Sequence, residues 1–337
     1  MRVLTLKDAS LAPLKGVPIA VIGYGAQGRA QALCFKDSGL QVVVGVREGG
    51  PSWNQAKQDG LRVASIAEAA REAELIHVLI PDECHKDVYD REIAPHVTQG
   101  KTLSFSHGFS VVYGRISPPA GVDVILVAPK APGTEERKAF LQGFGVPGLI
   151  AVRKNESGGA RDKALALAHA MGLTRAGVLE CTFEEETYED LFGEQAVLCG
   201  GVSELVKAGF ETLVEAGFPP EMAYFECLHE LKLIVDLMYE GGLTRMWDVV
   251  SNTAEYGGRT LGPKVIGPEV RERMRELLKD VQTGEFAKRW VAEYEAGLPN
   301  LRSMRKAEAE HPIEVVGRQV RSLFQKKVDP AAQAKAS

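Results

Sequence analysis

Short apolar runs alternate with helix-like segments throughout the first half of the chain, and this alternation constrains the fold most. The expected strands span residues 17–22, 41–46, 75–80, 102–105, 122–127 and 149–152. The expected helices between them span residues 27–36, 66–71, 86–93, 135–141 and 159–171. Because these strands are apolar along their whole length, both faces of their sheet must be covered. The pattern predicts an α/β domain built on a parallel sheet with helices on both faces.

From about Thr182 onward the sequence contains no further strong strand. Long periodic helical segments follow instead, at residues 184–216, 219–239, 243–256, 268–283, 285–296, 300–309 and 313–324. Glycines and prolines separate several of these segments, as is typical of helix ends. We therefore expect an α/β domain over residues 1–181, an all-helical domain over residues 182–327 and a flexible tail over residues 328–337.

A glycine-rich turn directly follows the first expected strand. It reads Gly23-Tyr24-Gly25-Ala26-Gln27-Gly28, a G-x-G-x-x-G sequence that opens the first expected helix. Glycines allow the tight turn and let backbone N–H groups approach a pyrophosphate at the helix N-terminus. The sequence alone is weak evidence, but strand, turn, helix and next strand lie within one short unit. We predict a dinucleotide site; the alternative is an ordinary strand-to-helix turn.

The end of the second expected strand indicates which dinucleotide binds. An NAD site usually has Asp or Glu there, bound to the ribose 2′-OH. This chain has Arg47 at that point and Ser52 in the loop that follows. A cation together with a hydroxyl suits a 2′-phosphate, so we predict NADPH. The alternative is that Arg47 is a solvated loop residue and that Glu48 binds the ribose.

Composition and charge exclude several classes of protein. The 337 residues are 45% hydrophobic and 25% charged, which is ordinary for a globular protein. A formal net charge of −5 argues against a protein that coats nucleic acid or an anionic membrane. No apolar run approaches the roughly 18 residues of a membrane span. The N-terminus lacks a signal-like apolar segment, and the five cysteines are widely spaced, so we expect reduced thiols and a cytoplasmic location.

Two pairs of carboxylates interrupt apolar helical stripes in the second half. Asp190 and Glu194 are four residues apart, as are Glu226 and Glu230, so each pair projects from one helical face. Buried carboxylates need a cation or a hydrogen-bond partner, and an oxygen-rich set favours Mg²⁺ over zinc. The alternative is surface salt bridging. For a neighbouring acidic run we expect only a solvated face: Glu184, Glu185, Glu186 and Glu189.

A histidine and a lysine follow two of the expected strands. His107 comes just after residues 102–105, and Lys130 just after residues 122–127. In a parallel sheet these positions are carboxyl ends of strands, where ligands bind. The other histidines carry no such context, except that His229 beside Glu230 is a spare ligand candidate. For the cysteines we expect purely structural roles.

Seven motifs, in order along the chain, match one known family. They are Val21-Ile-Gly-Tyr-Gly-Ala-Gln-Gly28, Pro81-Asp-Glu83, Ser106-His-Gly-Phe109, Ala128-Pro-Lys130, Asp190-Leu-Phe-Gly-Glu-Gln195, Glu226-Cys-Leu-His-Glu230 and Ser251-Asn-Thr-Ala-Glu-Tyr-Gly257. The sequence thus resembles ketol-acid reductoisomerase, also called acetohydroxy acid isomeroreductase, over nearly its whole length. Its length is similar to that of the short-chain class I, which has a single helical domain.

The resemblance implies a Rossmann-type doubly wound parallel sheet followed by an all-α, dimerising domain like that of 6-phosphogluconate dehydrogenase. It implies an NADPH-dependent oxidoreductase with two Mg²⁺ ions in branched-chain amino-acid biosynthesis. The reaction is alkyl migration followed by hydride reduction. It would convert 2-acetolactate to 2,3-dihydroxy-isovalerate, and 2-aceto-2-hydroxybutyrate to 2,3-dihydroxy-3-methylvalerate.

The motifs also imply which residues form the site. Asp190 and Glu194 would hold metal, with Asp190 bridging both ions, and Glu226 and Glu230 would complete the site from the partner subunit. Glu230 or a metal-bound hydroxide would take the substrate proton, and Ser251 would contact substrate. The remaining polar residues expected in the active site are His107 and Lys130. The residues expected at the cofactor are Gly23, Tyr24, Gly25, Ala26, Gln27, Gly28, Arg47, Ser52, Asp82 and Gly133.

The sequence departs from the family pattern at a few positions. The family usually has Ser and His where this chain has Ala26 and Arg29. Neither position needs a glycine, so we expect pyrophosphate binding to persist, with Arg29 adding charge near the phosphates. Cys84 and His85 follow the Pro-Asp-Glu motif in place of an apolar residue and Gln, and the loop from Arg47 is short.

The many apolar faces of the helical half predict a homodimer, and the sequence leaves open whether dimers assemble further, for example into dodecamers. Two other functions compete with the reductoisomerase. A metal-free β-hydroxyacid or imine reductase would combine the same two kinds of domain, and a regulatory protein would bind NADP without turnover. Neither gives the paired carboxylates a role, and we expect an acetohydroxy acid substrate and no nucleic-acid or membrane partner.

Overall fold

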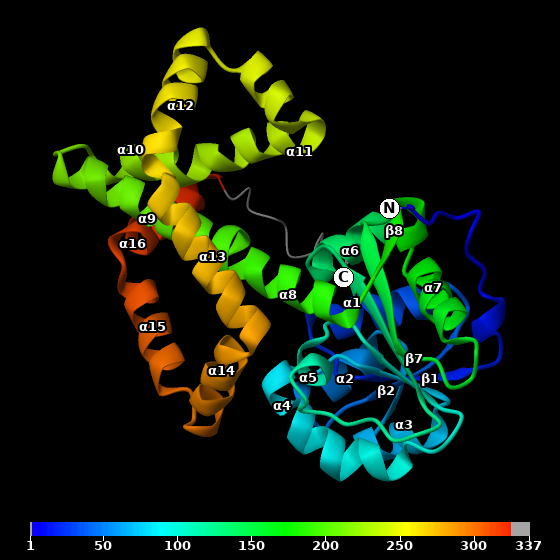
Figure 1. Cartoon of the computed structure of the whole chain (residues 1–337). Helices are drawn as coiled ribbons and strands as arrows, with labels where there is room; N and C mark the ends of the chain where they lie inside the picture. The colour runs from blue at the N-terminus through cyan, green and yellow to red at the C-terminus, as the bar shows by residue number, and fades with distance from the viewer. Residues whose placement is uncertain (1, 325–337) are drawn as a thin grey trace. The chain divides into compact units, whose positions relative to one another are not determined.

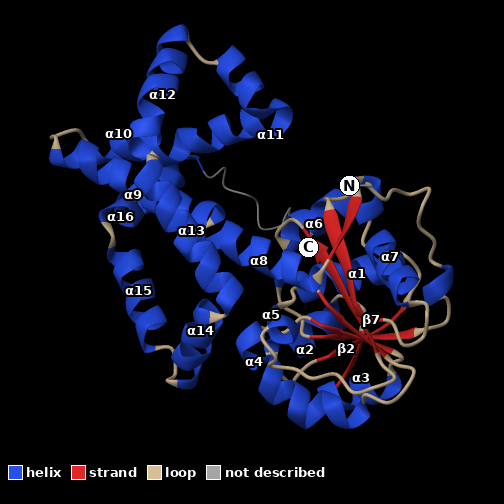
Figure 2. Cartoon of the chain, viewed as in Figure 1, coloured by secondary structure: helices blue, strands red, loops and turns tan. Residues whose placement is uncertain are grey.

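The computed structural model of the protein describes residues 2–324. Contacts within the chain divide it after Asp190 into two compact units (Figures 1 and 2). The predicted domain limits at 181/182 and 327/328 stay predictions. The predicted tail, residues 328–337, lies outside the described residues.

The first unit contains one sheet of eight strands in the order β3-β2-β1-β4-β5-β6-β7-β8. Its strands are β1 (Pro18–Ile22), β2 (Gln41–Gly45), β3 (Arg62–Ala64), β4 (Leu75–Val78), β5 (Thr102–Phe105), β6 (Asp123–Pro129), β7 (Gly148–Lys154) and β8 (Val178–Cys181). Side chains of neighbouring residues in a strand point to opposite faces. Ile19 and Val21 accordingly join one hydrophobic cluster, whereas Ala20 and Ile22 join another. The predicted α/β sheet, covered on both faces, is confirmed.

Helices of the first unit cover these two faces. They are α1 (Ala26–Asp37), α2 (Pro51–Gln58), α3 (Ile66–Glu72), α4 (Asp82–Val88), α5 (Phe109–Val112), α6 (Gly133–Leu141) and α7 (Ala160–Ala170), with short turns η1 (Ala12–Leu14), η2 (Tyr89–Ile93), η3 (Ala94–His96) and η4 (Leu173–Arg175). Phe35 of α1 and Leu167 of α7 belong to the cluster on one face, and Ile66 of α3 belongs to the cluster on the other. Helix α8 (Phe183–Gly193) follows β8, and the limit between the two units falls within its last turn.

The first unit differs from the expectation in three respects: the direction of one strand, the number of strands and one further helix. β7 runs antiparallel to β6, because the connection through α6 brings the chain back to the same edge, where Pro129 pairs with Gly148. The sequence analysis missed β3 and β8, which have only three and four residues, too few for a clear apolar period. It also expected a loop where α2 begins at Pro51, a position at which proline favours a helix start.

The second unit is helical throughout its described residues. Its elements are η5 (Glu194–Leu198), α9 (Gly200–Glu215), α10 (Pro220–Tyr224), η6 (Phe225–His229), α11 (Glu230–Val249), α12 (Asn252–Val265), α13 (Pro268–Thr283), α14 (Glu285–Glu295), α15 (Pro299–Glu310) and α16 (Pro312–Phe324). The segments η5 and η6 are single π-helical turns. Helix α11 is kinked where Gly241 and Gly242 leave helical geometry, with φ of +77° at Gly242. The predicted all-helical second half is confirmed.

The hydrophobic core of the second unit is small in the single chain. It gathers Val206, Phe210, Ala223, Tyr224, Ile313 and Val320 from α9, α10 and α16. Large apolar side chains elsewhere in this unit are exposed, among them Leu198, Leu233 and Tyr239. Among the described residues, no helix combines the length and the apolar content that crossing a membrane requires.

One carboxyl group is buried without a hydrogen-bond partner in the first turn of α6. Glu136 is 1% exposed, and neither of its carboxylate oxygens has a partner among the described residues. Burial raises the pKa of Glu136 to about 8, and the charge of Arg137 offsets only part of this effect. The folded protein therefore favours the protonated form of this group near neutral pH.

We expect Glu136→Gln to become more stable relative to the wild type as the pH rises. In the unfolded chain this carboxyl ionises near its ordinary pKa of 4.5, whereas in the folded protein it ionises at about 8. Wild-type stability should fall across that window, by on the order of a few kcal/mol, and glutamine cannot ionise. Urea unfolding between about pH 5 and pH 8 measures the difference. Glu135→Gln, at an exposed neighbour, is the control, and equal pH dependence in all three proteins would contradict the expectation.

Candidate active site

Two glycines of the glycine-rich turn are required by packing. Gly23, directly after β1, has φ of +103°, and a Cβ there would lie 2.6 Å from the carbonyl oxygen of Leu79. A Cβ at Gly28, in the first turn of α1, would lie 2.4 Å from the carbonyl oxygen of Gly23. Any side chain at either position would push apart backbone segments. The turn therefore holds the start of α1 close against β1 and the segment after β4.

The third glycine of the turn faces open space instead. A Cβ at Gly25 would have no heavy atom within 4 Å, and its φ of −77° suits any residue. Gly25 is the N-cap of α1, and no side chain caps this helix end. Backbone N–H groups at the N-terminus of a helix this long attract anions such as a pyrophosphate. An open position beside an uncapped helix start fits the predicted dinucleotide site.

The predicted cofactor residue Gly133 lies against the same turn. A Cβ at Gly133, the first residue of α6, would lie 2.4 Å from the carbonyl oxygen of Ala26. The side-chain amide of Gln27 donates a hydrogen bond of 3.0 Å to the carbonyl of Ala131, just before α6. The start of α6 is thus fixed to the start of α1, which brings the loop after β6 next to the glycine-rich turn.

Arg29 forms an ion pair with the carboxylate that follows α2. Its guanidinium makes two hydrogen bonds to the carboxylate of Asp59, with Nε 2.8 Å and Nη2 3.0 Å from the two oxygens. The hydroxyl of Tyr24 donates to the same carboxylate at 2.8 Å. Asp59 thus offsets the charge of Arg29, and the expectation that Arg29 adds charge near the phosphates stays a prediction.

The other predicted cofactor residues follow β2 and β4. Arg47 is exposed just after β2, and Ser52 lies half-buried in the first turn of α2. Asp82 is the first residue of α4, and its carboxylate is 3.8 Å from Nε2 of His85. His85 itself is buried and hydrogen-bonded to the carbonyl of Ile80 at 2.8 Å, which gives it a structural role at the start of α4.

Titratable side chains converge where β5 and β6 end. Because β5 and β6 are parallel neighbours, His107 and Lys130 follow them at one edge of the sheet. Nδ1 of His107 lies 3.2 Å from a carboxylate oxygen of Glu186 and 3.4 Å from one of Asp190. Nζ of Lys130 lies 2.9 Å from Asp190 and 2.6 Å from Glu189. The structure thus brings together His107, Lys130 and Asp190, as the sequence predicted.

Glu186 is buried, contrary to the prediction from the sequence. We expected a solvated carboxylate, but Glu186 is 1% exposed and accepts a hydrogen bond of 3.1 Å from the backbone N–H of Gly108. Glu189 agrees with the expectation, since its side chain is exposed and forms a salt bridge, here with Lys130. A helix with one face on the sheet edge buries only some members of an acidic run. Their i, i+3 and i+4 spacing, from Glu186 to Glu189 and Asp190, was the available signal.

The carboxylates shift the pKa values of both cations. Burial lowers the pKa of His107, but the hydrogen bond and charge of Glu186, with Asp82 and Asp190, outweigh burial and raise it to about 9. Burial likewise lowers the pKa of Lys130, and contacts with Glu189 and Asp190 raise it above its ordinary value. Both residues are therefore cationic at neutral pH. Nε2 of His107 is buried and has no partner among the described residues, so it can bind a further group.

A buried chain of polar side chains links the sheet to the glycine-rich turn. Nδ1 of His77, on β4, is 2.8 Å from the hydroxyl of Ser104, and Nε2 is 2.6 Å from the amide oxygen of Gln31. The amide nitrogen of Gln31 donates to Gln27 at 3.0 Å and to Ser106 at 3.1 Å. Burial lowers the pKa of His77 to about 3, so its ring is neutral. The chain connects Gln27 of the turn to Ser106, the residue before His107.

The remaining predicted site residues lie in the second unit and are exposed there. Glu194 begins the π-helical turn η5, Glu226 lies in the π-helical turn η6, and Glu230 begins α11. Single π-helical turns frequently mark functional sites. Within the described residues, one group of three possible ligands has its atoms within 4.8 Å of one another, namely His107, Glu186 and Asp190. The predicted grouping of Asp190 with the other three carboxylates stays a prediction.

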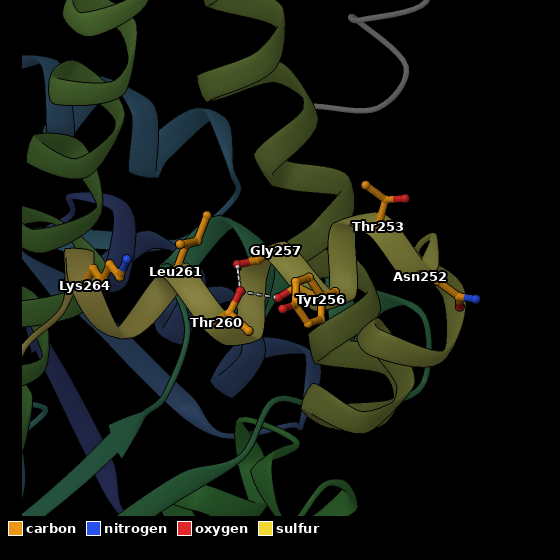
Figure 3. A pocket seen from close by; sticks show the side chains of 7 residues that line it. All are labelled: Asn252, Thr253, Tyr256, Gly257, Thr260, Leu261 and Lys264. Carbon is orange, nitrogen blue, oxygen red and sulfur yellow. Dashed lines mark hydrogen bonds between the residues drawn. The ribbon is translucent and has the colours of Figure 1, made fainter.

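Ser251 caps α12, where its hydroxyl oxygen accepts a hydrogen bond of 3.2 Å from the backbone N–H of Ala254. One face of the same helix lines an open hollow (Figure 3). The hollow is lined by Asn252, Thr253, Tyr256, Gly257, Thr260, Leu261 and Lys264. The predicted substrate residue thus precedes a concave, mixed polar and apolar surface.

Comparison with known proteins covers both halves of the chain. Residues 13–177 match the family model described as acetohydroxy acid isomeroreductase, NADPH-binding domain, and residues 183–326 match ketol-acid reductoisomerase, C-terminal domain. A ketol-acid reductoisomerase (NADP(+)) of Akkermansia muciniphila is 61% identical, over 94% of this chain and 97% of that protein. A ketol-acid reductoisomerase (NAD(+)) of the uncultured archaeon GZfos26G2 is 58% identical, over 97% of this chain and 100% of that protein.

A solved structure agrees with these relatives. The NADH-preferring ketol-acid reductoisomerase from an uncultured archaean has a TM-score of 0.95 and 57% identity, over 97% of this chain and 100% of that one. A glycine-rich dinucleotide turn beside an acid–base cluster at the strand ends defines the class of dinucleotide-dependent oxidoreductases. Within that class, the chain belongs to the ketol-acid reductoisomerase family. The resemblance seen in seven motifs is thereby confirmed.

Two glycines of the turn, Gly25 and Gly28, allow binding and stability to be tested separately. Gly25→Ala places a methyl group in open space, so we expect an unchanged melting temperature but dinucleotide binding at least about tenfold weaker. Gly28→Ala forces a methyl group against the carbonyl of Gly23, so we expect about 1–3 kcal/mol of destabilisation. Thermal melting and equilibrium titration with NADPH separate the two effects. Full affinity in Gly25→Ala would show that no dinucleotide approaches this position.

Proposed function

We propose that the protein is an NADPH- and Mg²⁺-dependent ketol-acid reductoisomerase. It converts 2-acetolactate to 2,3-dihydroxy-isovalerate, and 2-aceto-2-hydroxybutyrate to 2,3-dihydroxy-3-methylvalerate. The observation that carries the proposal is the convergence of His107, Lys130, Glu186 and Asp190 in the unit that contains the dinucleotide turn. Family membership supplies the reaction type, and this cluster supplies groups that can perform it.

The donor set suits two hard divalent ions. We assign Asp190, Glu194, Glu226 and Glu230 to them, with the last two from the partner subunit. Carboxylate oxygens are the ligands that Mg²⁺ prefers, and Asp190 lies beside two further possible ligands, Glu186 and His107. When bound, such ions lower the pKa of a substrate hydroxyl and polarise a ketone, which alkyl migration requires.

Side chains of the protein take up and return the protons of the reaction. Glu230 takes the proton of the substrate hydroxyl before migration. Lys130, between Asp190 and Glu189, offsets the negative charge of the acidic cluster and holds Asp190 in place. Glu186 orients His107 through Nδ1, and this leaves Nε2 of His107 to face substrate or bound water. Bound NADPH would supply the hydride, and this hydrogen-bonded cluster would give a proton to the reduced oxygen of the substrate.

We assign NADPH as the preferred dinucleotide. The match to an NADPH-binding domain model supports this choice, and so do Arg47 and Ser52 at the adenosine end. The relatives differ in this property, since their names carry NADP(+) in one case and NAD(+) in the other. A rate comparison between NADPH and NADH decides the preference. The cytoplasmic location stays a prediction.

The first experiment measures NADPH oxidation with racemic 2-acetolactate, with and without Mg²⁺, and again with NADH. We expect oxidation that depends strictly on Mg²⁺. Glu226→Gln should abolish turnover while equilibrium NADPH binding stays unchanged, because Glu226 lies in the second unit, outside the dinucleotide domain.

Glu221→Gln is the matched control, since Glu221 is exposed at the start of α10 and belongs to no proposed site. It should retain wild-type turnover. Oxidation that persists in EDTA would instead support the metal-free β-hydroxyacid or imine reductase. Unchanged turnover in Glu226→Gln would overturn the metal assignment.

The second unit supports a homodimer. Tyr239 is 90% exposed and Tyr256 74% exposed, and Leu198 and Leu243 are also largely uncovered. Large apolar side chains that are exposed in this number favour an interaction face, and a second copy of the chain would cover it. Assembly of dimers into dodecamers is one further possibility that the same measurement addresses.

We expect sedimentation equilibrium to give an even multiple of the 36.5 kDa chain mass. Leu243→Asp should shift the distribution toward the single chain, because it places a charge on the apolar face. Glu240→Gln, at an exposed neighbour, is the control. A monomer at micromolar wild-type concentrations would contradict the dimer and the assignment of Glu226 and Glu230 to the partner.

A further inference from the structure

The carboxylate of Asp59 is a hydrogen-bonding hub beside the dinucleotide turn. It accepts hydrogen bonds from Tyr24 Oη at 2.8 Å, from Arg29 Nε at 2.8 Å and Nη2 at 3.0 Å, and from Gln55 Nε2 at 3.2 Å. The backbone carbonyl of Asp59 also accepts from Nζ of Lys36 at 2.9 Å. Four hydrogen bonds fill the acceptor capacity of this one side chain.

The hub joins three separate parts of the first unit. Tyr24 lies between two glycines of the turn, Arg29 lies in the first turns of α1, and Gln55 and Asp59 lie in and directly after α2. The turn is the proposed pyrophosphate site, and Ser52 at the start of α2 is the proposed 2′-phosphate site. Asp59 therefore connects the elements that carry the two ends of the adenosine moiety.

Burial makes the hub strong. The Asp59 side chain is 12% exposed, and the Tyr24 side chain is buried. Burial alone would raise the pKa of Asp59, but the hydrogen bonds from Arg29 and Tyr24 outweigh it and lower the pKa. The carboxylate is thus ionised at neutral pH, and charge-assisted hydrogen bonds of this kind are about twice as strong as neutral ones.

The rest of α2 is held mainly by apolar contacts. Ala56 is fully buried, and Trp53 packs partly buried against the same cluster. Such contacts are non-directional and let a short helix shift or rotate. The directional bonds at Asp59 are therefore suited to fix the position of α2 relative to the glycine-rich turn.

We propose that Asp59 is a positioning residue for the dinucleotide: through Tyr24, Arg29 and Gln55 it sets the spacing between the glycine-rich turn and the start of α2. The proposal rests on the proposed function only in that the cofactor is a dinucleotide with its adenosine end at α2. Arg29 and Tyr24 act through Asp59 and not by direct charge on a phosphate.

The test measures dinucleotide affinity by isothermal titration calorimetry of the full chain with NADPH, without metal ion or substrate. Asp59→Asn loses the charge and cannot accept all four hydrogen bonds, so we expect affinity about tenfold weaker, or about 1.4 kcal/mol. The turnover number at saturating NADPH should stay within about twofold, which separates positioning from chemistry. Tyr24→Phe removes one bond and should weaken binding about threefold, a measurement that stands if Asp59→Asn fails to fold.

Asp123→Asn is the matched control for general destabilisation. Asp123 is also buried, and it accepts hydrogen bonds from Ser157 and from Lys163, but it lies at the start of β6, at the opposite end of that strand from Lys130. We expect this variant to lower the melting temperature and leave NADPH affinity unchanged. Arg29→Lys, which keeps the charge but loses the two-bond geometry, should fall between the wild type and Asp59→Asn.

Two results would overturn the inference. One is wild-type NADPH affinity in Asp59→Asn or, should that variant not fold, in Tyr24→Phe. The other is an equal loss of affinity in Asp123→Asn, which would indicate general destabilisation. Failure of the proposed function is distinguishable, because it would appear as a wild-type protein that does not turn over 2-acetolactate, whatever the affinities of the variants.

Discussion

Close backbone contact at the start of α1 is the constraint on which the proposed site depends. The first turn of this helix is packed between the glycine-rich turn on one side and the start of α6 on the other, with Gly28 and Gly133 each at the point of contact. A side chain at either position would separate elements that come from different parts of the chain. The same packing brings the loop after β6, and with it Lys130, to the edge of the sheet where His107 lies. The cofactor turn and the acid–base cluster are therefore placed by one set of contacts.

Polar side chains add direction to this packing. The neutral ring of His77 and the amide of Gln31 form buried hydrogen bonds in which each donor meets an acceptor. These hydrogen bonds connect β4 and the β5 segment to α1. Buried polar groups that are fully paired specify one arrangement, because any shift would leave an unpaired group at a cost of about 1–3 kcal/mol. Glu136 differs from these groups, because its buried carboxylate has no hydrogen-bond partner within residues 2–324, and the folded protein favours its neutral form.

The fold and much of the candidate site could be predicted from sequence because their signals are local. Apolar runs, glycine spacing and helical periodicity predicted the sheet, the dinucleotide turn and the helical second half. What escaped prediction depends on tertiary placement. Strand β7 is antiparallel because the chain returns through α6 to the same edge of β6. Strands β3 and β8 are too short to show an apolar period. Glu186 has the same residue type as the rest of an acidic run, and only the packing of α8 separates it from its exposed neighbour Glu185. His77 has no sequence signature, since its partners come from other elements.

Helix α2 is tied to the rest of its unit by hydrogen bonds near its carboxyl end, whereas its first turn begins at Gly50 without a side-chain cap. The connection from Arg47 to Pro51 is thus bounded by a rigid strand on one side and an anchored helix on the other. The length and composition of such a loop can change while β2 and α2 on either side of it keep their positions. With the 2′-phosphate at Arg47 and Ser52, as proposed, substitutions in this one short loop would change the choice of dinucleotide without altering the rest of the domain.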